Sequence, residues 1–388
     1  MRITWVTRSF LDYRIPVYKA LDKLCGHQLT VIYNGEVVPL RCREKLNRVL
    51  GERAIPLSGE IRLTGVAQDN ATMANRGFRI PLQKGLIKAI RNSQPDVLLS
   101  DGFFQWTYAP LWIRAFNTRR IKHIMCYERT PHTERNAGKL RTLYRKFVSR
   151  WIDGIDCNGR LTAEYVRNTL KYNKALAFGH MTAETEGVAK RTNTVTQQQM
   201  EELQRCYNLK GTVFLYIGQL IPRKGIMELL KAWLYADLKD ATLLLVGDGK
   251  QKDEILDFIN LHHLTNVVVA GAVNYDELGP YYNVADCFII PTLEDNWSLV
   301  VPEAMAAGLP IACSIYNGCH PELVQQSNGW TFDPLDTQSI IQTLKAILSK
   351  KESLSQMGNA SKNIVSNHTP VHAAEEIYRL CETVVKNR

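Results

Sequence analysis

The sequence predicts an α/β protein with two doubly wound domains, each built on a parallel sheet. Three observations lead to this prediction. Short apolar runs typical of buried strands alternate with segments of helical periodicity along the whole chain. The length of 388 residues is enough for about two domains. A polar stretch at residues 182–199 has little to bury and separates two such alternating sets, which is typical of an inter-domain linker.

The first alternating set begins at the N-terminus, where residues 2–7 form an apolar run that predicts a strand. Further strands are expected at residues 29–33, 96–100, 122–127, 155–158 and 175–178. Helices are expected at residues 81–92, 105–117 and 137–151. Together these elements predict a first domain over residues 1–185.

The second alternating set predicts another domain over residues 200–368. Its strands are expected at residues 212–217, 241–246, 266–270, 286–290 and 310–313, and its helices near residues 225–235, 252–262, 276–283 and 337–349. After Pro370 an amphipathic pattern predicts a last helix. We expect the final segment, residues 369–388, to pack back on the first domain. Two such domains are expected to face each other across a ligand-binding cleft.

The composition is that of a folded globular protein. Hydrophobic residues make up 45% of the chain and charged residues 22%, so a large core is available. No apolar run reaches the roughly 20 residues of a membrane-spanning helix. The N-terminal residues lack a signal-peptide pattern, because Arg8 interrupts the apolar stretch. The nine cysteines form no CxxC pair, which indicates a reducing cytoplasm and neither a disulfide framework nor a zinc site.

Residues 135–151 hold part of the formal net charge of +10. Apolar side chains recur there at helical spacing, at Leu140, Leu143, Tyr144, Phe147 and Trp151. Two interpretations remain open. Either these side chains enter the core and leave a solvated basic face, or the helix contacts an anionic membrane surface through Arg141, Arg145 and Lys146. No nucleic-acid-binding motif accompanies the charge, so a nucleic-acid partner is not expected.

The most informative segment is residues 291–310, PTLEDNWSLVVPEAMAAGLP. An apolar strand precedes it, and Asp295 follows in a polar loop. Glu303 comes eight residues later, at the start of a helix that Gly308 ends. Loops after strands of a parallel sheet line the ligand crevice, and helix N-termini there favour anions. Two carboxylates beside such a helix suit a phosphorylated polyol.

A second loop, after the strand at residues 212–217, has the residues of a phosphate site. Gly218 allows close approach of the backbone to a ligand. Lys224 stands just before the next helix, where an ammonium group can meet a phosphate. Arg223 is a second candidate cation.

Weaker signals follow other strands. Gly247 and Gly249 form a glycine-flanked turn, and Gly271-Ala272-Val273 follows the next strand. An ordinary tight turn explains each of these motifs nearly as well as a ligand-binding role does. In the first half, His132 follows the strand at residues 122–127 and is a candidate site residue. His123 is the alternative candidate.

These motifs, in order over about residues 205–350, resemble the retaining glycosyltransferases of the GT-B fold, especially family 4. The segment around Asp295 and Glu303 is similar to the E-x7-E signature of that family, with Asp295 in place of the first Glu and Asn296-Trp297-Ser298 in place of Gly-Phe-Gly. Gln219 occupies the position of the family's diphosphate arginine, and residues 317–322 match the family's G-G-x-x-E only at Gly318 and Glu322.

The resemblance implies roles for the candidate residues. Lys224, Asp295 and His132 are the expected catalytic residues, His132 by contact with the donor sugar. The expected donor-binding residues are Gly218, Arg223, Lys224, Gly271, Val273, Asp295, Leu299, Val300 and Glu303. The donor is expected to be a UDP- or GDP-sugar, used as substrate, with no further cofactor. No D-x-D motif is present, so a metal-bridged diphosphate is not expected.

The implied function is transfer of a sugar, with retained configuration, to a hydroxyl of a glycan or lipid-linked glycan in surface polysaccharide synthesis. The expected location is the cytoplasm, at the inner face of the membrane. Two alternatives stay open from the sequence. A sugar-nucleotide epimerase would share the fold and the diphosphate site, and a non-enzymatic basic binding protein would explain the charge but not the ordered motifs.

Overall fold

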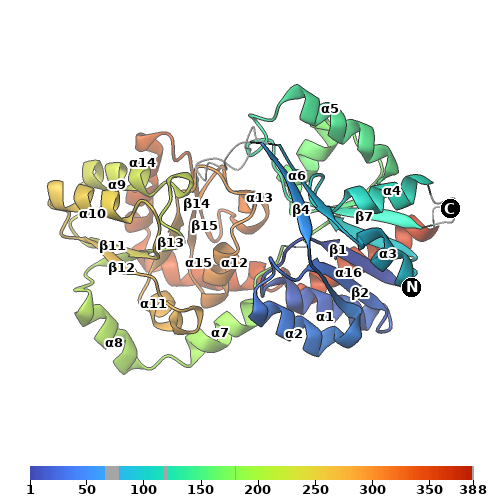
Figure 1. Ribbon diagram of the computed structural model, residues 1–388. Helices are drawn as coiled ribbons and strands as arrows, with labels where there is room; N and C mark the ends of the chain where they lie inside the picture. Colours follow the sequence, from blue (N-terminus) through green and yellow to red (C-terminus); the bar gives the residue numbers. More distant parts are fainter. Residues whose placement is uncertain (66–77, 117–120, 180, 387–388) are drawn as a thin grey trace. The chain divides into compact units, whose positions relative to one another are not determined.

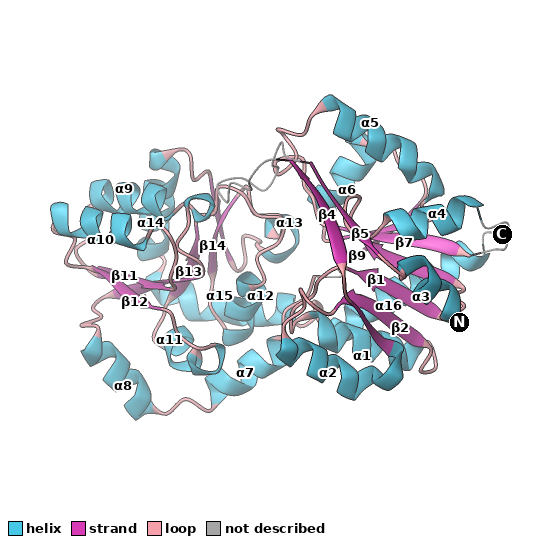
Figure 2. Cartoon of the chain, viewed as in Figure 1, coloured by secondary structure: helices cyan, strands magenta, loops and turns pink. Residues whose placement is uncertain are grey.

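The computed structural model describes residues 1–65, 78–116, 121–179 and 181–386, which form two compact units (Figure 1). Among these residues, the first unit consists of the chain up to residue 182 together with the chain from residue 369 onward. The second unit is formed by residues 183–368. Figure 2 shows the strands of each unit gathered into a layer with helices packed around it.

The first unit is built on a seven-stranded parallel sheet. The strand order is β3-β2-β1-β6-β7-β8-β9. The strands are β1 (Ile3–Thr7), β2 (Leu29–Asn34), β3 (Ala54–Leu57), β6 (Val97–Asp101), β7 (Lys122–Tyr127), β8 (Gly154–Cys157) and β9 (Ala175–Phe178). Strands β4 (Glu60–Gly65) and β5 (Phe78–Gln83) form a separate antiparallel pair. In the sequence they come between β3 and β6.

The helices of the first unit follow its strands in alternation. They are α1 (Arg14–Leu24), α2 (Leu40–Leu50), α3 (Leu86–Asn92), α4 (Tyr108–Phe116), α5 (Lys139–Val148), α6 (Arg160–Glu164) and α16 (Pro370–Lys386). Helix α16 packs against α1 and β9. It therefore belongs to the first unit although the whole second unit precedes it in the chain.

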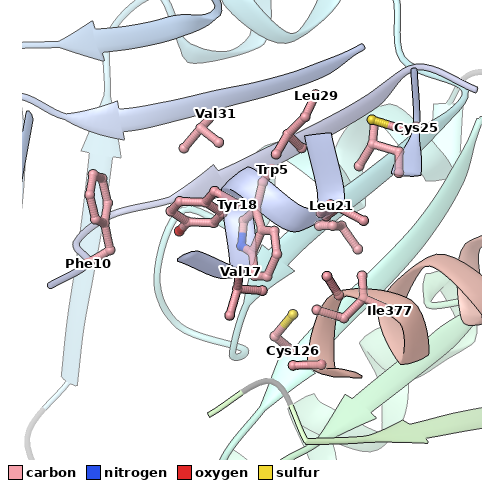
Figure 3. Packing of buried hydrophobic residues seen from close by; sticks show 14 of the residues in the cluster. Trp5, Phe10, Val17, Tyr18, Leu21, Cys25, Leu29, Val31, Cys126 and Ile377 are labelled. Atoms are coloured by element: carbon pink, nitrogen blue, oxygen red, sulfur yellow. The ribbon is translucent and has the colours of Figure 1, made fainter. Parts of the chain in front are cut away.

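The largest hydrophobic cluster of the first unit joins the sheet to α1 and α16 (Figure 3). The Trp5 ring on β1 meets the Tyr18 ring on α1 edge to face, with centroids 5.1 Å apart. Ile377 of α16 is fully buried in the same cluster. Strand β1 lies between β2 and β6, and all five of its residues are buried, as expected for an inner strand of a parallel sheet with both faces covered.

The second unit holds a six-stranded parallel sheet in the order β12-β11-β10-β13-β14-β15. The strands are β10 (Thr212–Ile217), β11 (Ala241–Val246), β12 (Val267–Gly271), β13 (Cys287–Ile290), β14 (Ile311–Ser314) and β15 (Gly329–Phe332). The helices are α7 (Thr185–Asn193), α8 (Gln197–Cys206), α9 (Ile226–Ala236), α10 (Lys252–Leu261), α11 (Gly279–Asn283), α12 (Val300–Ala307), α13 (His320–Leu323), α14 (Thr337–Ser349) and α15 (Leu354–Val365). The predicted fold class, α/β with two doubly wound parallel sheets, is confirmed.

Two local predictions are wrong. The polar stretch at residues 182–199 is not a bare linker, since it forms α7, which packs against α12. Thr185, Val188 and Thr192 are buried there, so this otherwise polar segment has an inward face. The helix expected from residue 81 begins only at Leu86, because Pro81 lies within strand β5.

None of the helices in the described ranges is long and apolar enough to cross a bilayer.

Candidate functional site

The strand order of the second sheet reverses between β10 and its neighbour β13. In open parallel sheets, ligands bind beside the carboxyl ends of the strands at such a point. The loop after β10 leads through a 3₁₀ turn, Pro222–Lys224, into α9. The loop after β13, residues 291–299, leads into α12. These two loops define the candidate site.

Backbone contacts hold the two loops together. The Arg223 carbonyl accepts a hydrogen bond from the Leu293 N–H at 2.9 Å and another from Thr292 Oγ1 at 3.0 Å. Gly225 has a φ of +70°, and a Cβ there would lie 2.0 Å from the Pro291 carbonyl oxygen. Only glycine fits this close approach, so the position of Gly225 in the sequence fixes how closely the loops pack.

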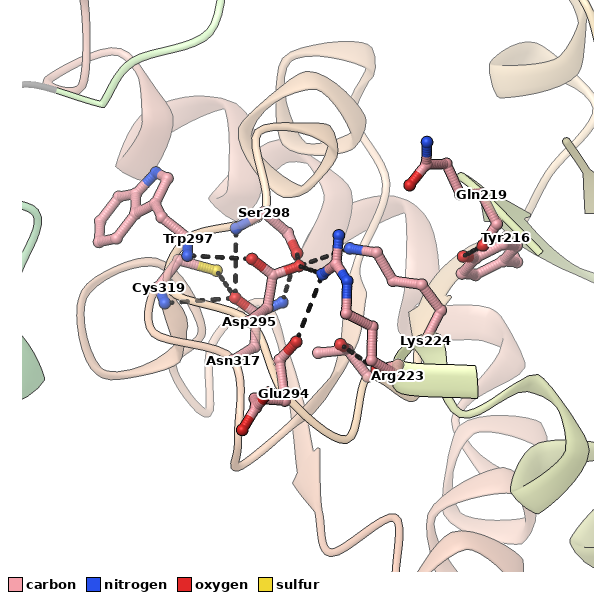
Figure 4. A network of polar contacts seen from close by, with 11 residues as sticks. Tyr216, Gln219, Arg223, Lys224, Glu294, Asp295, Trp297, Ser298, Asn317 and Cys319 are labelled. Atoms are coloured by element: carbon pink, nitrogen blue, oxygen red, sulfur yellow. Dashed lines mark hydrogen bonds and ion pairs between the residues drawn. The ribbon is translucent and has the colours of Figure 1, made fainter. Parts of the chain in front are cut away.

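Lys224 and Asp295 meet where these loops touch (Figure 4). The Lys224 Nζ donates to Asp295 Oδ2 at 2.5 Å. Ser298 Oγ donates to the same oxygen at 2.7 Å, and the Trp297 N–H donates to Oδ1 at 3.2 Å. Asn317 in turn donates from Nδ2 to Ser298 Oγ at 2.9 Å. The Asp295 carboxylate is thus oriented by groups from three loops.

The Asp295 carboxylate is buried but charged. Burial by itself raises the pKa of this carboxyl, but the charge of Lys224 and the hydrogen bonds from Lys224 and Ser298 outweigh it and hold the pKa below its ordinary value. The Asp295 side chain is 9% exposed and that of Lys224 13%. Removing one partner of a buried ion pair leaves an uncompensated charge and typically costs about 3–5 kcal/mol. The pair is therefore part of the fold as well as of the candidate site.

Arg223 adds a second cation beside this pair. Its Nη1 lies 3.9 Å from Asp295 Oδ2 and 3.5 Å from the Glu294 carbonyl oxygen. Gln219, in the same loop, is exposed and carries no charge. The positive charge of the β10 loop therefore comes from Arg223 and Lys224.

Gly247 and Gly249 allow the turn after β11 to lie close to those after β10 and β12. A Cβ on Gly247 would lie 1.8 Å from the Gly218 carbonyl oxygen. The Gly247 N–H donates to the Gly271 carbonyl at 2.8 Å. A Cβ on Gly249 would lie 2.3 Å from the Leu220 carbonyl oxygen. The glycine-flanked turn at residues 247–249 therefore has a packing reason that requires no ligand.

Glu303 lies in the first turn of α12, where two tyrosines contact its carboxyl group. Tyr275 Oη donates to Oε1 at 3.2 Å, and Tyr282 Oη donates to Oε2 at 3.4 Å. Burial raises the pKa of Glu303 to about 7, although both hydrogen bonds and Arg191 act in the opposite direction. The Arg191 Cζ lies 4.5 Å from the centroid of the Tyr275 ring. At neutral pH, Glu303 is therefore close to its titration midpoint.

Residues 200–364 match the family model described as Glycosyl transferases group 1. This match covers most of the second unit and less than half of the whole chain. The matched range contains every residue of the candidate site described so far except Arg191, which lies on α7 just before it.

Curated relatives agree with this match over part of their length. The sulfoquinovosyl transferase SQD2 of Arabidopsis thaliana is 29% identical over 151 residues, which are 38% of this chain and 29% of that protein. The lipopolysaccharide 1,2-N-acetylglucosaminetransferase of Salmonella typhimurium is 28% identical over 190 residues, 46% of this chain and 49% of that protein. The chain thus spans half or less of the length of these relatives.

A solved structure extends the similarity of fold to both units. Anabaena HepE in complex with UDP superposes with a TM-score of 0.73 at 14% identity, covering 99% of this chain and 100% of HepE. This chain therefore has the α/β architecture of GT-B glycosyltransferase structures.

The structure places the other predicted donor-binding residues of the second unit as follows. Leu299 is the N-cap of α12 and Val300 its first residue, both half-buried. Gly271 ends β12 with a φ of +80°, and Val273 is half-buried two residues later. The structure brings Arg223, Lys224 and Asp295 into contact, and it puts Glu303 eight residues from Asp295 on the adjoining helix.

His132 lies in the first unit, in the turn that follows β7. Its carbonyl accepts a hydrogen bond from Arg135 Nη1 at 2.7 Å. Its contact with a donor sugar stays a prediction. Its rival His123 is fully buried within β7, where Nε2 lies 2.8 Å from Ser100 Oγ and burial lowers the pKa to about 4. His123 is thus a neutral core histidine.

Several residues of the site were not singled out from the sequence. They are Ser298 and Asn317, which orient Asp295, and Tyr275, Tyr282 and Arg191, which surround Glu303. Ser298 was visible only as a departure from a glycine in the family pattern. The two tyrosines come from the segment between β12 and β13, and no spacing rule connects them to Glu303.

Proposed function

We propose that the protein transfers a sugar from a nucleoside-diphosphate donor to an acceptor hydroxyl, with retention of the anomeric configuration, as in family 4. The observation that supports this most is the Lys224–Asp295 pair at the carboxyl edge of a group 1 domain, with Arg223 beside it. It combines cations for a diphosphate and a fixed carboxylate for sugar hydroxyls where β10 and β13 end.

The donor-binding roles follow from position and charge. Glu303 accepts hydrogen bonds from ribose hydroxyls, Asp295 from hydroxyls of the transferred sugar, and Lys224 with Arg223 binds the diphosphate. The backbone at Gly218, Leu299 and Val300 approaches the phosphates, while Gly271 and Val273 border the base. UDP or GDP is the proposed nucleotide; the similar HepE structure holds UDP.

The chemistry depends on charge that grows as the diphosphate leaves. The bond between the anomeric carbon and the diphosphate oxygen breaks, and the acceptor hydroxyl bonds to that carbon on the same face. A phosphate oxygen takes the hydroxyl proton. Lys224 and Arg223 stabilise the departing diphosphate, a form of electrostatic stabilisation that is often the largest catalytic effect. His132 contacts the donor sugar. These cations take the place of a metal, so we propose a metal-independent enzyme.

The proposed acceptor is a glycan or lipid-linked glycan in surface polysaccharide or glycoconjugate synthesis. One relative is named for its action on lipopolysaccharide, which favours this class. A lipid-linked acceptor would place the enzyme at the cytoplasmic face of the membrane.

Donor binding tests this proposal directly. The purified protein is heated with UDP-, GDP- and ADP-sugars, and the shift in melting temperature is recorded for each. We expect one nucleotide to raise the melting temperature in wild type and much less in Glu303→Gln. Release of the nucleoside diphosphate on addition of acceptor then measures turnover. If none of the nucleotide sugars shifts the transition, the proposal is wrong.

A further inference from the structure

We infer that helix α5 (Lys139–Val148) is a docking surface for anionic membrane lipid. The surface consists of the outward side chains Leu140, Leu143, Tyr144 and Phe147 and the exposed basic residues Lys139, Lys146 and Arg150 around them. The inference deepens the proposed function and rests on it for the acceptor, because it supplies a surface by which a lipid-linked glycan would be reached.

The helix is inverted with respect to an ordinary surface helix. Leu140 is 83% exposed, Leu143 63% and Phe147 51%, and the three recur on one helical face. The side chains that point inward are instead Arg145 and, at the end of the helix, Val148, which are both buried. The Arg145 guanidinium donates to both carboxylate oxygens of Glu134, at 2.7 and 3.0 Å. The protein thus buries a charge and exposes most of the apolar side chains of the same helix.

This inversion decides between the two interpretations left open by the sequence. The apolar residues Leu140, Leu143 and Phe147 do not enter the core. Of the three basic residues expected at a membrane, Arg145 is excluded by its burial, while Lys146 is exposed. The helical periodicity separates the apolar side chains from the basic ones, but it does not reveal which of the two faces inward. Arg145 can face inward because Glu134, which lies outside the helix, neutralises its charge.

Charge identifies the occupant of this face. The segment 135–151 contains six basic and no acidic residues. Its sequence neighbour Glu134 is already occupied by Arg145. Arg150 holds its guanidinium 5.4 Å from the Phe147 ring centroid, next to the apolar residues. Apolar side chains ringed by cations are typical of helices that lie in the interface of an anionic bilayer, whereas a protein partner for an all-basic rim would have to supply a matching acidic surface.

Vesicle co-sedimentation of the full chain tests the inference. One set of vesicles is phosphatidylcholine alone, and the other contains phosphatidylglycerol as well. We expect binding to the anionic vesicles only, weakened by salt. Lys139→Gln combined with Lys146→Gln should weaken binding about 25-fold, at about fivefold per cation. Leu140→Gln combined with Leu143→Gln should weaken it at least about tenfold through lost insertion.

Matched controls come from the second unit. Leu261 is 74% exposed on α10, and Lys231 and Lys239 are exposed basic residues. Leu261→Gln and the Lys231→Gln/Lys239→Gln pair should leave vesicle binding within about twofold of wild type, at the size expected for surface changes outside the contact. All variants change exposed positions, so unaltered melting temperatures confirm that each has folded.

Three results would overturn the inference. The first is no binding to anionic vesicles at low salt, and the second is an equal loss of binding in the control variants. The third is a wild-type dimer in sedimentation velocity that Leu140→Gln/Leu143→Gln dissociates, which would assign the face to a second copy of the chain. The melting shift with nucleotide sugar separates this inference from the proposed function. A chain that binds nucleotide sugar but no vesicles refutes only the docking surface, and one that binds vesicles but no nucleotide sugar refutes only the transferase.

Discussion

Asn317 donates a hydrogen bond to the hydroxyl of Ser298 at 2.9 Å across 19 positions of sequence. The Ser298 hydroxyl in turn donates a hydrogen bond to Asp295 Oδ2 at 2.7 Å. Asn317 also accepts the Cys319 N–H on its Oδ1 at 3.4 Å. Ser298 occupies a position where the family pattern has glycine. In this protein the Asn317–Ser298–Asp295 series of hydrogen bonds therefore orients the carboxylate.

This relationship predicts energetic coupling between the two side chains. Asn317→Ala and Ser298→Ala should each lower the free energy of unfolding by about 1–3 kcal/mol, since each leaves a buried polar partner unpaired. The double variant should lose less than the sum, with a coupling energy of at least about 0.5 kcal/mol. Urea denaturation measures the cycle. As a control, Ser298→Ala with Thr242→Ala, at the amino-terminal end of β11, should be additive; additivity in both pairs would contradict the coupling.

Glu303→Gln tests the proposed ribose contact. The substitution keeps the shape of the side chain but removes the carboxylate charge, and charge-assisted hydrogen bonds contribute about 1.5–3 kcal/mol. We expect the affinity for the nucleotide sugar to fall tenfold or more, while the chain still folds. Isothermal titration of wild type and variant measures this. Wild-type affinity in Glu303→Gln would remove Glu303 from the donor site.

The raised pKa of Glu303 predicts that folding stability and donor affinity change in opposite directions with pH. Its folded pKa of about 7 lies above the ordinary value of 4.5, so the folded state binds the extra proton between these pH values. This stabilisation is complete below pH 4.5 and is lost as the pH rises through about 7, a change of roughly 3 kcal/mol. Under the proposed role of Glu303, the ribose hydroxyls bind its carboxylate, so donor binding should instead strengthen as the pH rises through 7. In Glu303→Gln both dependences on this group should disappear; unchanged profiles would mean that another group titrates.

Lys224→Ala should damage both stability and turnover. Because Lys224 neutralises buried Asp295, its loss should lower the free energy of unfolding by about 3–5 kcal/mol. Turnover should fall more than donor affinity, since charge on the diphosphate grows in the transition state. Lys224→Met combined with Asp295→Asn removes both charges and should recover much of the stability but not the activity.

The exposed pair Lys252–Asp248, 3.8 Å apart, supplies the matched control. Lys252→Ala should change stability by less than about 1 kcal/mol, as exposed ion pairs usually do. If Arg223→Ala reduces turnover more than Lys224→Ala, then Arg223 is the main diphosphate cation.

Chelation tests the absence of a metal requirement. With Lys224 and Arg223 available for the diphosphate, sugar transfer should persist at a rate near that of the untreated enzyme after dialysis against EDTA. Nucleoside-diphosphate release gives the rate. A complete loss that magnesium or manganese restores would show that the phosphates are held through a metal ion.

The fold was predictable because burial on both faces of a parallel sheet leaves an unambiguous pattern. Strands such as Thr212–Ile217 and Ala241–Val246 are predominantly apolar, and the structure puts them at the predicted positions. Helix α7 was missed because its stability comes from α12, against which it packs, and a packing partner is invisible to local periodicity. Pro81 in β5 was assigned to a helix for a similar reason, since the pairing partner β4 lies beyond the segment itself.

The site was only partly predictable. Lys224 and Asp295 stood out from their positions after strands, and parallel-sheet geometry brings those loops together. That the two residues would bind each other did not follow from spacing, because 71 positions separate them. The tyrosines around Glu303 and the inward direction of Arg145 depend on tertiary contacts with other segments, which a single sequence does not reveal.

The placement of α16 determines the order in which the chain can fold during synthesis. The hydrophobic cluster that contains Trp5 and Tyr18 is closed by Ile377, Leu380 and other residues of the last helix. Chains fold as they leave the ribosome, N-terminal domains first. Here residues 183–368 emerge and can fold while the earlier part still lacks its closing helix. A ribosome stalled before residue 369 would therefore hold a folded second unit tethered to an incomplete first unit with open apolar surface, a natural substrate for chaperones.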